Sequence, residues 1–350
     1  LNHILVNELD NVRSRVYVAA RNDGRWTRTA LPGTPEFGSV VVTAVDGDAS
    51  DAYFMTVTGF LTPTGLYLGT AGAGVPEKLK QLPDLFDATG LEVSQHETAS
   101  KDGTRVPYFQ VARANIAPNG KQPTLLYGYG GFEIAKLPEY SGIVGAAWLE
   151  QGGVYVVANI RGGGEFGPQW HQAALKSNRG RAYEDFIAVA EDLVRRGITT
   201  PPHLGARGGS NGGLLMGNML TMRPDLFGAI VCQVPVLDMR RYHLLLAGAS
   251  WIGEFGNPDD PDEWAFIESF SPYHNLKAGV RYPPILFTTS TRDDRVHPGH
   301  ARKMAARMLD AGHEVLYYEN IEGGHGGAAT NAQQAHMNAL VHAFLWQKLR

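Results

Sequence analysis

The stretch Gly208-Gly209-Ser210-Asn211-Gly212-Gly213 decides the fold, because it places a serine at a sharp turn between a strand and a helix. The strand is indicated by Leu204-Gly205-Ala206-Arg207, and the helix by the run from Leu214 to Met222. A serine at such a turn has a strained backbone, and side chains two residues to either side would collide, so glycine is the tolerated residue at both positions. Amides at the start of the helix point to where an oxyanion would develop. The motif predicts a nucleophilic serine, with a glycine-rich turn and a bystander serine as the alternative for the motif taken alone.

A nucleophilic serine needs a base, and the base needs a carboxylate that orients it. Two later segments can supply them, each directly after a predicted strand: Thr291-Arg292-Asp293-Asp294-Arg295-Val296 and Glu322-Gly323-Gly324-His325-Gly326-Gly327. Active-site loops gather at the carboxyl ends of parallel strands, and the glycines beside His325 let its loop pass close to the serine. Four further histidines fall on or beside predicted helices, where we expect solvated surface side chains: His297, His300, His313 and His336.

The first part of the chain has a different pattern from the rest. Short apolar runs at 16–20, 40–42, 52–57 and 66–68 are separated by turn residues, which is typical of antiparallel β structure. Residues 1–73 are too few for a complete propeller, so we expect a partial β-propeller of one or two blades. Residues 74–92 contain Gly74, Pro76, Pro83 and Gly90 and are predicted to be a linker.

From Val106 onward, apolar strands alternate with helices. Strands are predicted at 124–127, 154–158, 229–233, 285–289 and 315–318, and helices at 182–196, at about 299–311 and at the C-terminus as far as Leu349. This alternation predicts an α/β domain with a mostly parallel sheet that is covered by helices on both faces. We assign residues 74–350 to this domain.

Composition excludes several classes of protein. The 350 residues include 31 Lys+Arg and 35 Asp+Glu, and a net charge of −4 without a long basic run argues against nucleic acid as a partner. A single cysteine, Cys232, excludes an internal disulfide framework and a multi-cysteine metal site. No stretch approaches the roughly 20 apolar residues of a membrane span, so no membrane partner is expected. Because residue 1 is Leu, the sequence leaves the compartment open between cytoplasm and periplasm.

A second glycine motif suggests a different function. Gly162-Gly163-Gly164-Glu165-Phe166-Gly167 fits the dinucleotide fingerprint after a strand, and Asp185 lies about 20 residues further on. A dinucleotide site needs that acidic residue at the end of the second strand, whereas Asp185 falls inside a predicted helix. We therefore predict a structural loop here and not a nucleotide site.

Five motifs in order resemble those of the prolyl oligopeptidase (prolyl endopeptidase) family of serine peptidases. The resemblance runs from roughly residue 50 to the C-terminus. It is carried by Tyr127-Gly128-Tyr129-Gly130-Gly131-Phe132, Asn159-Ile160-Arg161-Gly162-Gly163-Gly164-Glu165-Phe166-Gly167, Gly208-Gly209-Ser210-Asn211-Gly212-Gly213, Asp293-Asp294-Arg295-Val296 and Gly324-His325-Gly326. It implies an α/β-hydrolase fold preceded by a partial β-propeller.

The resemblance also implies a role for each matching residue. Ser210 is the expected nucleophile, His325 the general base and Asp293 its orienting partner. Tyr129 and the backbone N–H of Asn211 are the expected oxyanion donors, and the Asn211 side chain is a further candidate for substrate binding. The implied substrate-binding residues are Phe132, Val236, Trp251, Phe255, Arg295 and Val296, with Arg295 on a peptide carbonyl and Trp251 against a proline ring. No metal or organic cofactor is implied.

The implied substrate is a short peptide that is cleaved on the carboxyl side of proline. Phe255 stands where prolyl-specific members carry a tyrosine, so the strictness of the proline preference is left open. A basic-specific branch of the family would need acidic groups near the pocket, and Glu254 and Asp259 lie in the relevant stretch. A serine hydrolase of different specificity and a weakly active or inactive remnant are also compatible with these residues. Family members carry a complete propeller, so we expect this chain to be a fragment, a processed chain or the product of an incomplete gene, with the missing propeller portion as its partner.

Overall fold

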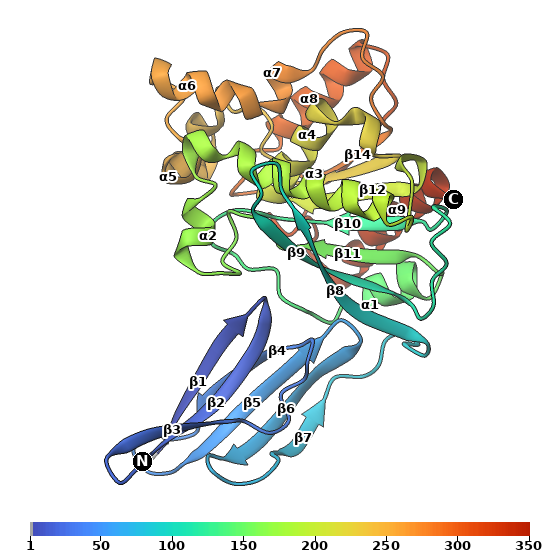
Figure 1. Cartoon of the computed structure of the whole chain (residues 1–350). Coiled ribbons are helices and arrows are strands. Elements are labelled where there is room, and N and C mark those ends of the chain that lie inside the picture. The colour runs from blue at the N-terminus through green and yellow to red at the C-terminus, as the bar shows by residue number, and fades with distance from the viewer. Residues whose placement is uncertain (1–2) are drawn as a thin grey trace. The chain divides into compact units, whose positions relative to one another are not determined.

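The computed structural model describes residues 3–350, which divide into two compact units. The first comprises residues 3–93 together with 137–146, and the second comprises residues 94–136 and 147–350. Figure 1 shows the course of the chain through both units.

The first unit consists of two antiparallel sheets. One sheet has the order β1-β2-β3, and the other has the order β4-β5-β6-β7. The strands are β1 (His3–Asp10), β2 (Arg13–Asn22), β3 (Arg25–Ala30), β4 (Ser39–Ala44), β5 (Ala52–Gly59), β6 (Thr62–Thr70) and β7 (Glu77–Gln81). Alternate apolar residues of β2, β4 and β5 form its core, as the period of a half-buried strand requires. Both sheets are antiparallel, as the sequence predicts for this part of the chain, and no closed propeller is present among residues 3–350. The assignment of these sheets to propeller blades stays a prediction.

The segment predicted as a linker is structured. Residues 77–81 pair with β6 as β7, and the first unit continues to residue 93 instead of ending near 73. Phe86 stacks on Tyr140 with ring centroids 5.1 Å apart, and the Tyr140 hydroxyl accepts a 2.7 Å hydrogen bond from the Leu85 backbone. The glycines and prolines of 74–92 therefore mark turns within a packed unit. The short helix α1 (Gly142–Val144) also belongs to this unit.

The second unit is built on an eight-stranded sheet of order β15-β14-β13-β12-β10-β11-β9-β8. Its strands are β8 (Leu91–Ala99), β9 (Arg105–Arg113), β10 (Thr124–Tyr127), β11 (Val154–Ala158), β12 (Leu204–Gly209), β13 (Ala229–Gln233), β14 (Ile285–Ser290) and β15 (Val315–Asn320). The six strands from β15 to β11 pair in parallel, and β9 joins β11 antiparallel. The prediction of a mostly parallel sheet is confirmed.

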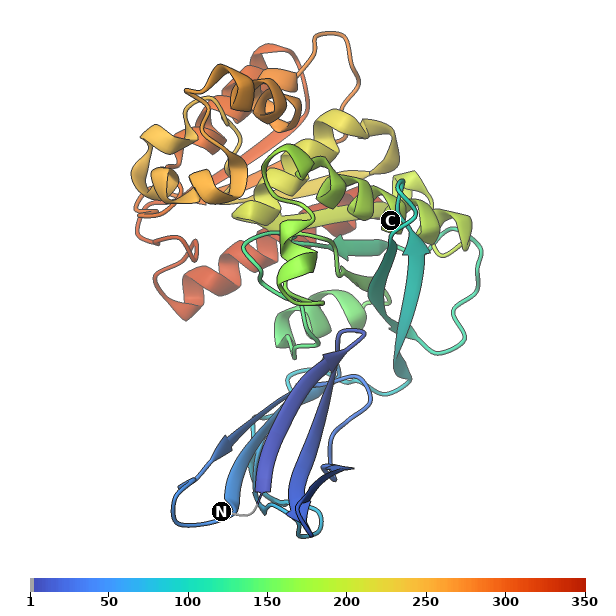
Figure 2. The ribbon, with the colours of Figure 1, turned by 60° about the vertical axis from the view of Figure 1, so that its left-hand side comes forward.

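Helices cover both faces of this sheet (Figures 1 and 2). They are α2 (Pro168–Gln172), α3 (Gly180–Arg195), α4 (Asn211–Met222), α5 (Ile252–Phe255), α6 (Pro261–Ile267), α7 (Pro272–Asn275), α8 (Gly299–Asp310) and α9 (Asn331–Leu349). Figure 2 shows α9 on the other side of the strands from α3 and α4. No helix within residues 3–350 combines the length and the apolar character that a membrane crossing requires.

Strand β12 shows how the sheet separates its two helical layers. A Cβ on Gly205 would lie 2.7 Å from Leu349 of α9, whereas a Cβ on Gly208 would lie 2.3 Å from the Gly212 carbonyl oxygen of α4. Residues an odd number apart on a strand face opposite sides, which accounts for both contacts. The small residues of β12 therefore let both layers approach the strand that carries the serine.

The loop after β10, which we call the Tyr129 loop (residues 128–136), packs against the hydrophobic core at its first residue. A Cβ on Gly128 would lie 2.7 Å from the Phe186 ring, which is buried on α3. At its other end, the Lys136 backbone N–H donates a 2.8 Å hydrogen bond to Glu165 Oε1. The loop is thus held at both ends by buried side chains.

Glu165 is a buried carboxyl group that accepts a hydrogen bond from a backbone amide and not from a cationic side chain. In the described part of the chain, its Oε2 atom and Asn159 Oδ1 are both buried without a hydrogen-bond partner. Burial raises the pKa of Glu165 from 4.5 to about 7, while the hydrogen bond from Lys136 acts in the opposite direction. The site therefore stabilises the protonated, neutral form of Glu165 relative to its carboxylate.

Replacing Phe186 with alanine should lower the free energy of unfolding by about 3–5 kcal/mol, because it leaves a cavity beneath the Tyr129 loop. Urea unfolding followed by tryptophan fluorescence measures this change, since five of the six tryptophans, all but Trp26, lie in the second unit. The matched control is Leu309→Ala on α8, where the side chain is 54% exposed and the change should stay within about 0.5 kcal/mol. Equal effects of the two substitutions would contradict the packing described.

Glu165→Gln should remove a pH dependence of stability. Between about pH 4.5 and 7 the folded chain keeps a proton that the unfolded chain loses, so the free energy of unfolding falls as pH rises, by about 3 kcal/mol over the whole window. Glutamine keeps the acceptor for Lys136 and adds a donor, and it cannot ionise. We expect the wild-type chain to lose stability relative to Glu165→Gln between about pH 4.5 and 7 in urea unfolding. Parallel pH profiles for the two chains would show that Glu165 is ionised in the folded state.

Candidate active site

Ser210 lies at the turn between β12 and α4 in a strained conformation. Its φ and ψ are 60° and −117°, in the region where L-residues are rare. A Cβ on Gly212 would lie 2.8 Å from the Gly128 carbonyl oxygen, and one on Gly208 would meet Gly212 itself. The expected crowding around the serine is therefore present. The Ser210 backbone N–H donates to the Gln233 carbonyl oxygen at 2.9 Å, which fixes the turn to β13.

Asp293 and His325 are brought together by the loops after β14 and β15. Asp293 Oδ2 lies 2.8 Å from His325 Nδ1. The second carboxylate oxygen, Oδ1, accepts 2.9 Å hydrogen bonds from the backbone N–H groups of Arg295 and Val296. These bonds fix the carboxylate, and with Nδ1 as the donor the free lone pair of the imidazole is on Nε2.

The carboxyl ends of β12, β14 and β15 lie at one edge of the parallel sheet, so the loops that carry Ser210, Asp293 and His325 share that edge. Within the described residues, no hydrogen bond joins His325 to Ser210. Catalytic hydrogen bonds are often long without substrate and tighten when it binds.

The competing histidines have different surroundings. His336 is exposed, as predicted. For His300 the prediction of a solvated surface side chain is wrong: it is buried at the start of α8, and its Nδ1 accepts a 3.1 Å hydrogen bond from the Asp238 backbone. Burial lowers the pKa of His300 to about 4, so it is neutral near pH 7. His297 and His313 are partly exposed.

Tyr129 lies beside the serine, because both residues line the same cavity. Burial raises the pKa of Tyr129 above its ordinary value, although the positive charges of Arg295 and Arg179 and the nearby Ser210 hydroxyl act in the opposite direction. The phenol is therefore protonated at neutral pH and can donate to a developing oxyanion.

A cavity of about 100 Å³ opens beside the serine. It is lined by Tyr129, Phe132, Ile134, Ser210, Asn211, Val236, Trp251, Phe255 and Arg295. All of these residues except Ile134 are among the site residues that the sequence indicates. Val296 does not line the cavity; it is buried in the core, and its backbone N–H holds Asp293. The signal available for Ile134 was its position two residues after Phe132 on the same loop.

The cavity wall is mainly aromatic. The rings of Phe132 and Phe255 meet edge to face with centroids 5.6 Å apart, and Trp251 is largely buried beside them. An aromatic wall of this kind favours an apolar side chain and leaves a charged one unpaired.

The acidic residues of this stretch are occupied elsewhere. Glu254 accepts hydrogen bonds from Arg179 Nη1 at 2.9 Å and from the Phe132 backbone N–H at 3.0 Å, and it does not line the cavity. Asp259 pairs with His243 at 2.9 Å. Neither carboxylate is placed to receive a basic side chain in this cavity.

The Asn211 side chain is bound within the protein. Its Nδ2 donates a 2.6 Å hydrogen bond to the Tyr129 carbonyl oxygen, and its Oδ1 accepts a 2.5 Å bond from Arg179 Nη2. Asn211 is 1% exposed and lines the cavity, and the expectation that its side chain contacts substrate stays a prediction. Its backbone N–H, at the start of α4, remains the candidate oxyanion donor.

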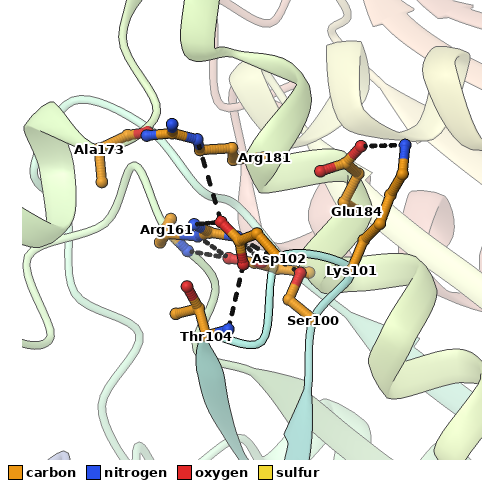
Figure 3. Close-up of polar contacts among 9 residues, drawn as sticks. Ser100, Lys101, Asp102, Thr104, Arg161, Ala173, Arg181 and Glu184 are labelled. Carbon is orange, nitrogen blue, oxygen red and sulfur yellow. Dashed lines mark hydrogen bonds and ion pairs between the residues drawn. The ribbon is translucent and has the colours of Figure 1, made fainter.

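The second glycine motif has a structural role. Asp185, the residue that would hold a ribose, is 0% exposed and accepts hydrogen bonds from the backbone N–H, Nε and Nη2 of Arg161. Figure 3 shows Arg161 also reaching Asp102 in the turn between β8 and β9. A nucleotide cannot reach a carboxylate that is buried and already paired, so the predicted structural loop agrees with the geometry.

No cluster of three metal-ligating side chains occurs within residues 3–350. The arrangement that is present consists of a strained serine, a histidine–carboxylate pair, a phenol donor and an apolar cavity. These are the parts needed for nucleophilic attack on a carbonyl group.

Comparison with known proteins places these features in a family. Residues 140–350 match the model of the prolyl oligopeptidase family. An uncharacterized peptidase of Sinorhizobium fredii, y4nA, is 52% identical over 348 residues, which cover 99% of this chain and 48% of that protein. A prolyl endopeptidase of Elizabethkingia miricola is 37% identical over 295 residues, which cover 83% of this chain and 42% of that protein.

Solved structures agree with the sequence comparison. A post-proline cleaving enzyme from Rickettsia typhi superposes with a TM-score of 0.90 at 35% identity, over 99% of this chain and 50% of that chain. The chain spans about half the length of the curated relatives it matches. It belongs to the prolyl oligopeptidase family of serine peptidases, and its second unit is an α/β-hydrolase domain.

Proposed function

We propose that this chain provides the catalytic part of a serine endopeptidase that hydrolyses short peptides on the carboxyl side of proline. The observation that carries the proposal is the cavity that Ser210 and Tyr129 line together with the aromatic side chains of Phe132, Trp251 and Phe255. A nucleophile at the mouth of an apolar slot attacks the carbonyl of the residue whose side chain fills the slot. The relatives named prolyl endopeptidase and post-proline cleaving enzyme support the same specificity.

The reaction proceeds through an acyl-enzyme. His325 Nε2 takes the proton of Ser210 Oγ, and Oγ attacks the carbonyl carbon of the proline residue. The Tyr129 hydroxyl and the Asn211 backbone N–H donate to the oxyanion while Asp293 stabilises the imidazolium. The C–N bond then breaks, the proton passes from His325 to the leaving amine, and water hydrolyses the ester by the same steps. Arg295, on the cavity wall, binds a carbonyl group of the peptide.

A second candidate is a serine hydrolase of different specificity with the same triad. The observation that favours it is Phe255, which offers no hydroxyl where prolyl-specific members of the family carry a tyrosine.

Chromogenic substrates separate these candidates. The 350-residue chain should hydrolyse a blocked Gly-Pro anilide faster than its Gly-Arg counterpart by about tenfold or more, since a charged side chain in an apolar cavity is left unpaired. Ser210→Ala should abolish both turnover and labelling by a fluorophosphonate, whereas Ser269→Ala, at an exposed serine, should change neither. Labelling of Ser210 with equal turnover of both anilides would favour the second candidate, and absence of labelling would contradict both candidates.

Tyr129→Phe should lower kcat on the Gly-Pro anilide by about 100-fold to 1000-fold, because it removes one oxyanion donor and keeps the ring. KM should change by no more than about threefold, since the ground-state carbonyl needs that donor less than the oxyanion does. Steady-state kinetics of the two chains provide the measurement. A large rise in KM with unchanged kcat would assign Tyr129 to substrate binding alone.

A further inference from the structure

A buried ion pair lies behind the wall of the cavity and takes no part in the proposed reaction steps. Arg179 Nη1 and Glu254 Oε1 are 2.9 Å apart, and their side chains are 1% and 5% exposed. Removing two charges from water costs several kcal/mol for each ion, and the cost is offset only where the geometry and the further hydrogen bonds are good. Such a pair contributes little to the free energy of folding. Its role in the protein is therefore inferred from the residues that it contacts.

Glu254 holds one side of the cavity wall. Its Oε1 also accepts a 3.0 Å hydrogen bond from the Phe132 backbone N–H, and its Oε2 lies 2.7 Å from His171 Nε2. Phe132 has a φ of 56°, which a non-glycine residue adopts only where its surroundings impose it. The carboxylate therefore fixes the backbone of the residue whose ring forms the cavity wall.

Arg179 contacts two further residues that line the cavity, Asn211 and Phe255. Its Nη2 donates to Asn211 Oδ1 at 2.5 Å, and the Asn211 amide in turn donates to the Tyr129 carbonyl oxygen at 2.6 Å. The guanidinium also lies 5.2 Å from the centroid of the Phe255 ring. A planar guanidinium binds two acceptors at once in a fixed geometry, which a lysine ammonium does not do.

The spacing leaves these groups little freedom. A Cβ on Gly131 would lie 2.6 Å from Asn211 Nδ2 and 3.1 Å from Arg179 Nη2, so the Tyr129 loop packs directly on the two side chains. One ion pair thus bonds to the backbone of Phe132 and, through the Asn211 side chain, to the backbone of Tyr129. Asn211 and Tyr129 are the two residues that carry the proposed oxyanion donors.

We propose that Arg179 and Glu254 are positioning residues that hold the Tyr129 hydroxyl and the Asn211 amide in the geometry of the oxyanion hole. The proposal rests on the proposed function, because it assigns the pair to the reaction at Ser210. Neither residue touches substrate. Arg179 acts through Asn211 and Tyr129, and Glu254 acts through Arg179 and Phe132.

A double-substitution cycle tests the proposal in the full chain. Arg179→Met should lower kcat on the Gly-Pro anilide by about 10-fold to 100-fold, because small displacements of catalytic groups have effects of this size. In the Tyr129→Phe background the same substitution should cost at least about threefold less than it does in the wild type, since one of the two donors that Arg179 positions is already absent. Equal losses in both backgrounds would show that Arg179 does not act through Tyr129 and would overturn the proposal.

Arg179→Lys separates positioning from stability. Lysine keeps the charge beside Glu254, so urea unfolding should be close to that of the wild type, but it cannot bind Glu254 and Asn211 together, so kcat should stay low. The matched control is Tyr108→Phe, which removes a buried hydroxyl on β9 that bonds to Asp192. This control should lose stability and keep kcat. A wild-type kcat for Arg179→Lys would contradict the proposal.

The same cycle distinguishes failure of this proposal from failure of the proposed function. If the wild-type chain does not cleave the anilide but its Ser210 reacts with a fluorophosphonate, the rate of that reaction replaces kcat in the cycle. If Ser210 is unreactive, the proposed function fails, and a crystal structure of Arg179→Met decides the positioning role. A displaced Tyr129 loop would support it, and an unchanged loop with Asn211 still on the Tyr129 carbonyl would overturn it.

Discussion

The steric contact between Gly208 and Gly212 around Ser210 is the constraint on which the rest of the second unit depends. A positive φ at Ser210 turns the chain from β12 into α4 within one residue, and this is possible only because neither flanking position carries a side chain. The turn then determines where α4 begins, and hence where the Asn211 N–H and the amide of its side chain lie. Displacing α4 would move the nucleophile and an oxyanion donor together.

Glycines elsewhere in the unit allow layers of backbone to pack on the Tyr129 loop. A Cβ on Gly162 would lie 2.4 Å from the Gly130 carbonyl oxygen, and one on Gly164 would lie 2.3 Å from that of Glu133. The sequence that fits a dinucleotide fingerprint therefore has a different physical reason for its glycines, namely close approach of two loops instead of a loop and a phosphate. Arg161, at the start of this loop, is anchored by Asp185 on α3. Short-range patterns alone do not distinguish these two uses of glycine.

Sequence reasoning succeeded where a local pattern carries the information. The parallel strands are short apolar runs, and the motif residues follow them at the carboxyl edge, so β12, β14 and β15 and the loops after them were predictable. Sequence reasoning failed where a contact with a residue far along the chain determines the secondary structure or the burial of a residue. Strand β7 reads Glu-Lys-Leu-Lys-Gln and is exposed throughout, and only its pairing with β6 makes it a strand. His300 is buried because the backbone of Asp238, about sixty positions earlier in the chain, packs against it, and nothing near His300 indicates that contact.

The absence of a hydroxyl at Phe255 makes sense in its surroundings. The ring is 0% exposed and meets the edges or faces of Phe132 and Tyr242 at 5.6 Å each, with the Arg179 guanidinium beside it. A phenol oxygen buried there would need a hydrogen-bond partner, whereas phenylalanine needs none. Arg179 already binds Glu254 through Nη1 and Asn211 through Nη2, and the Phe255 ring leaves these two bonds undisturbed. In this chain the apolar cavity and the polar pair behind it therefore depend on each other: the pair can be charged because it is shielded from substrate, and the cavity stays apolar because the charges face away from it.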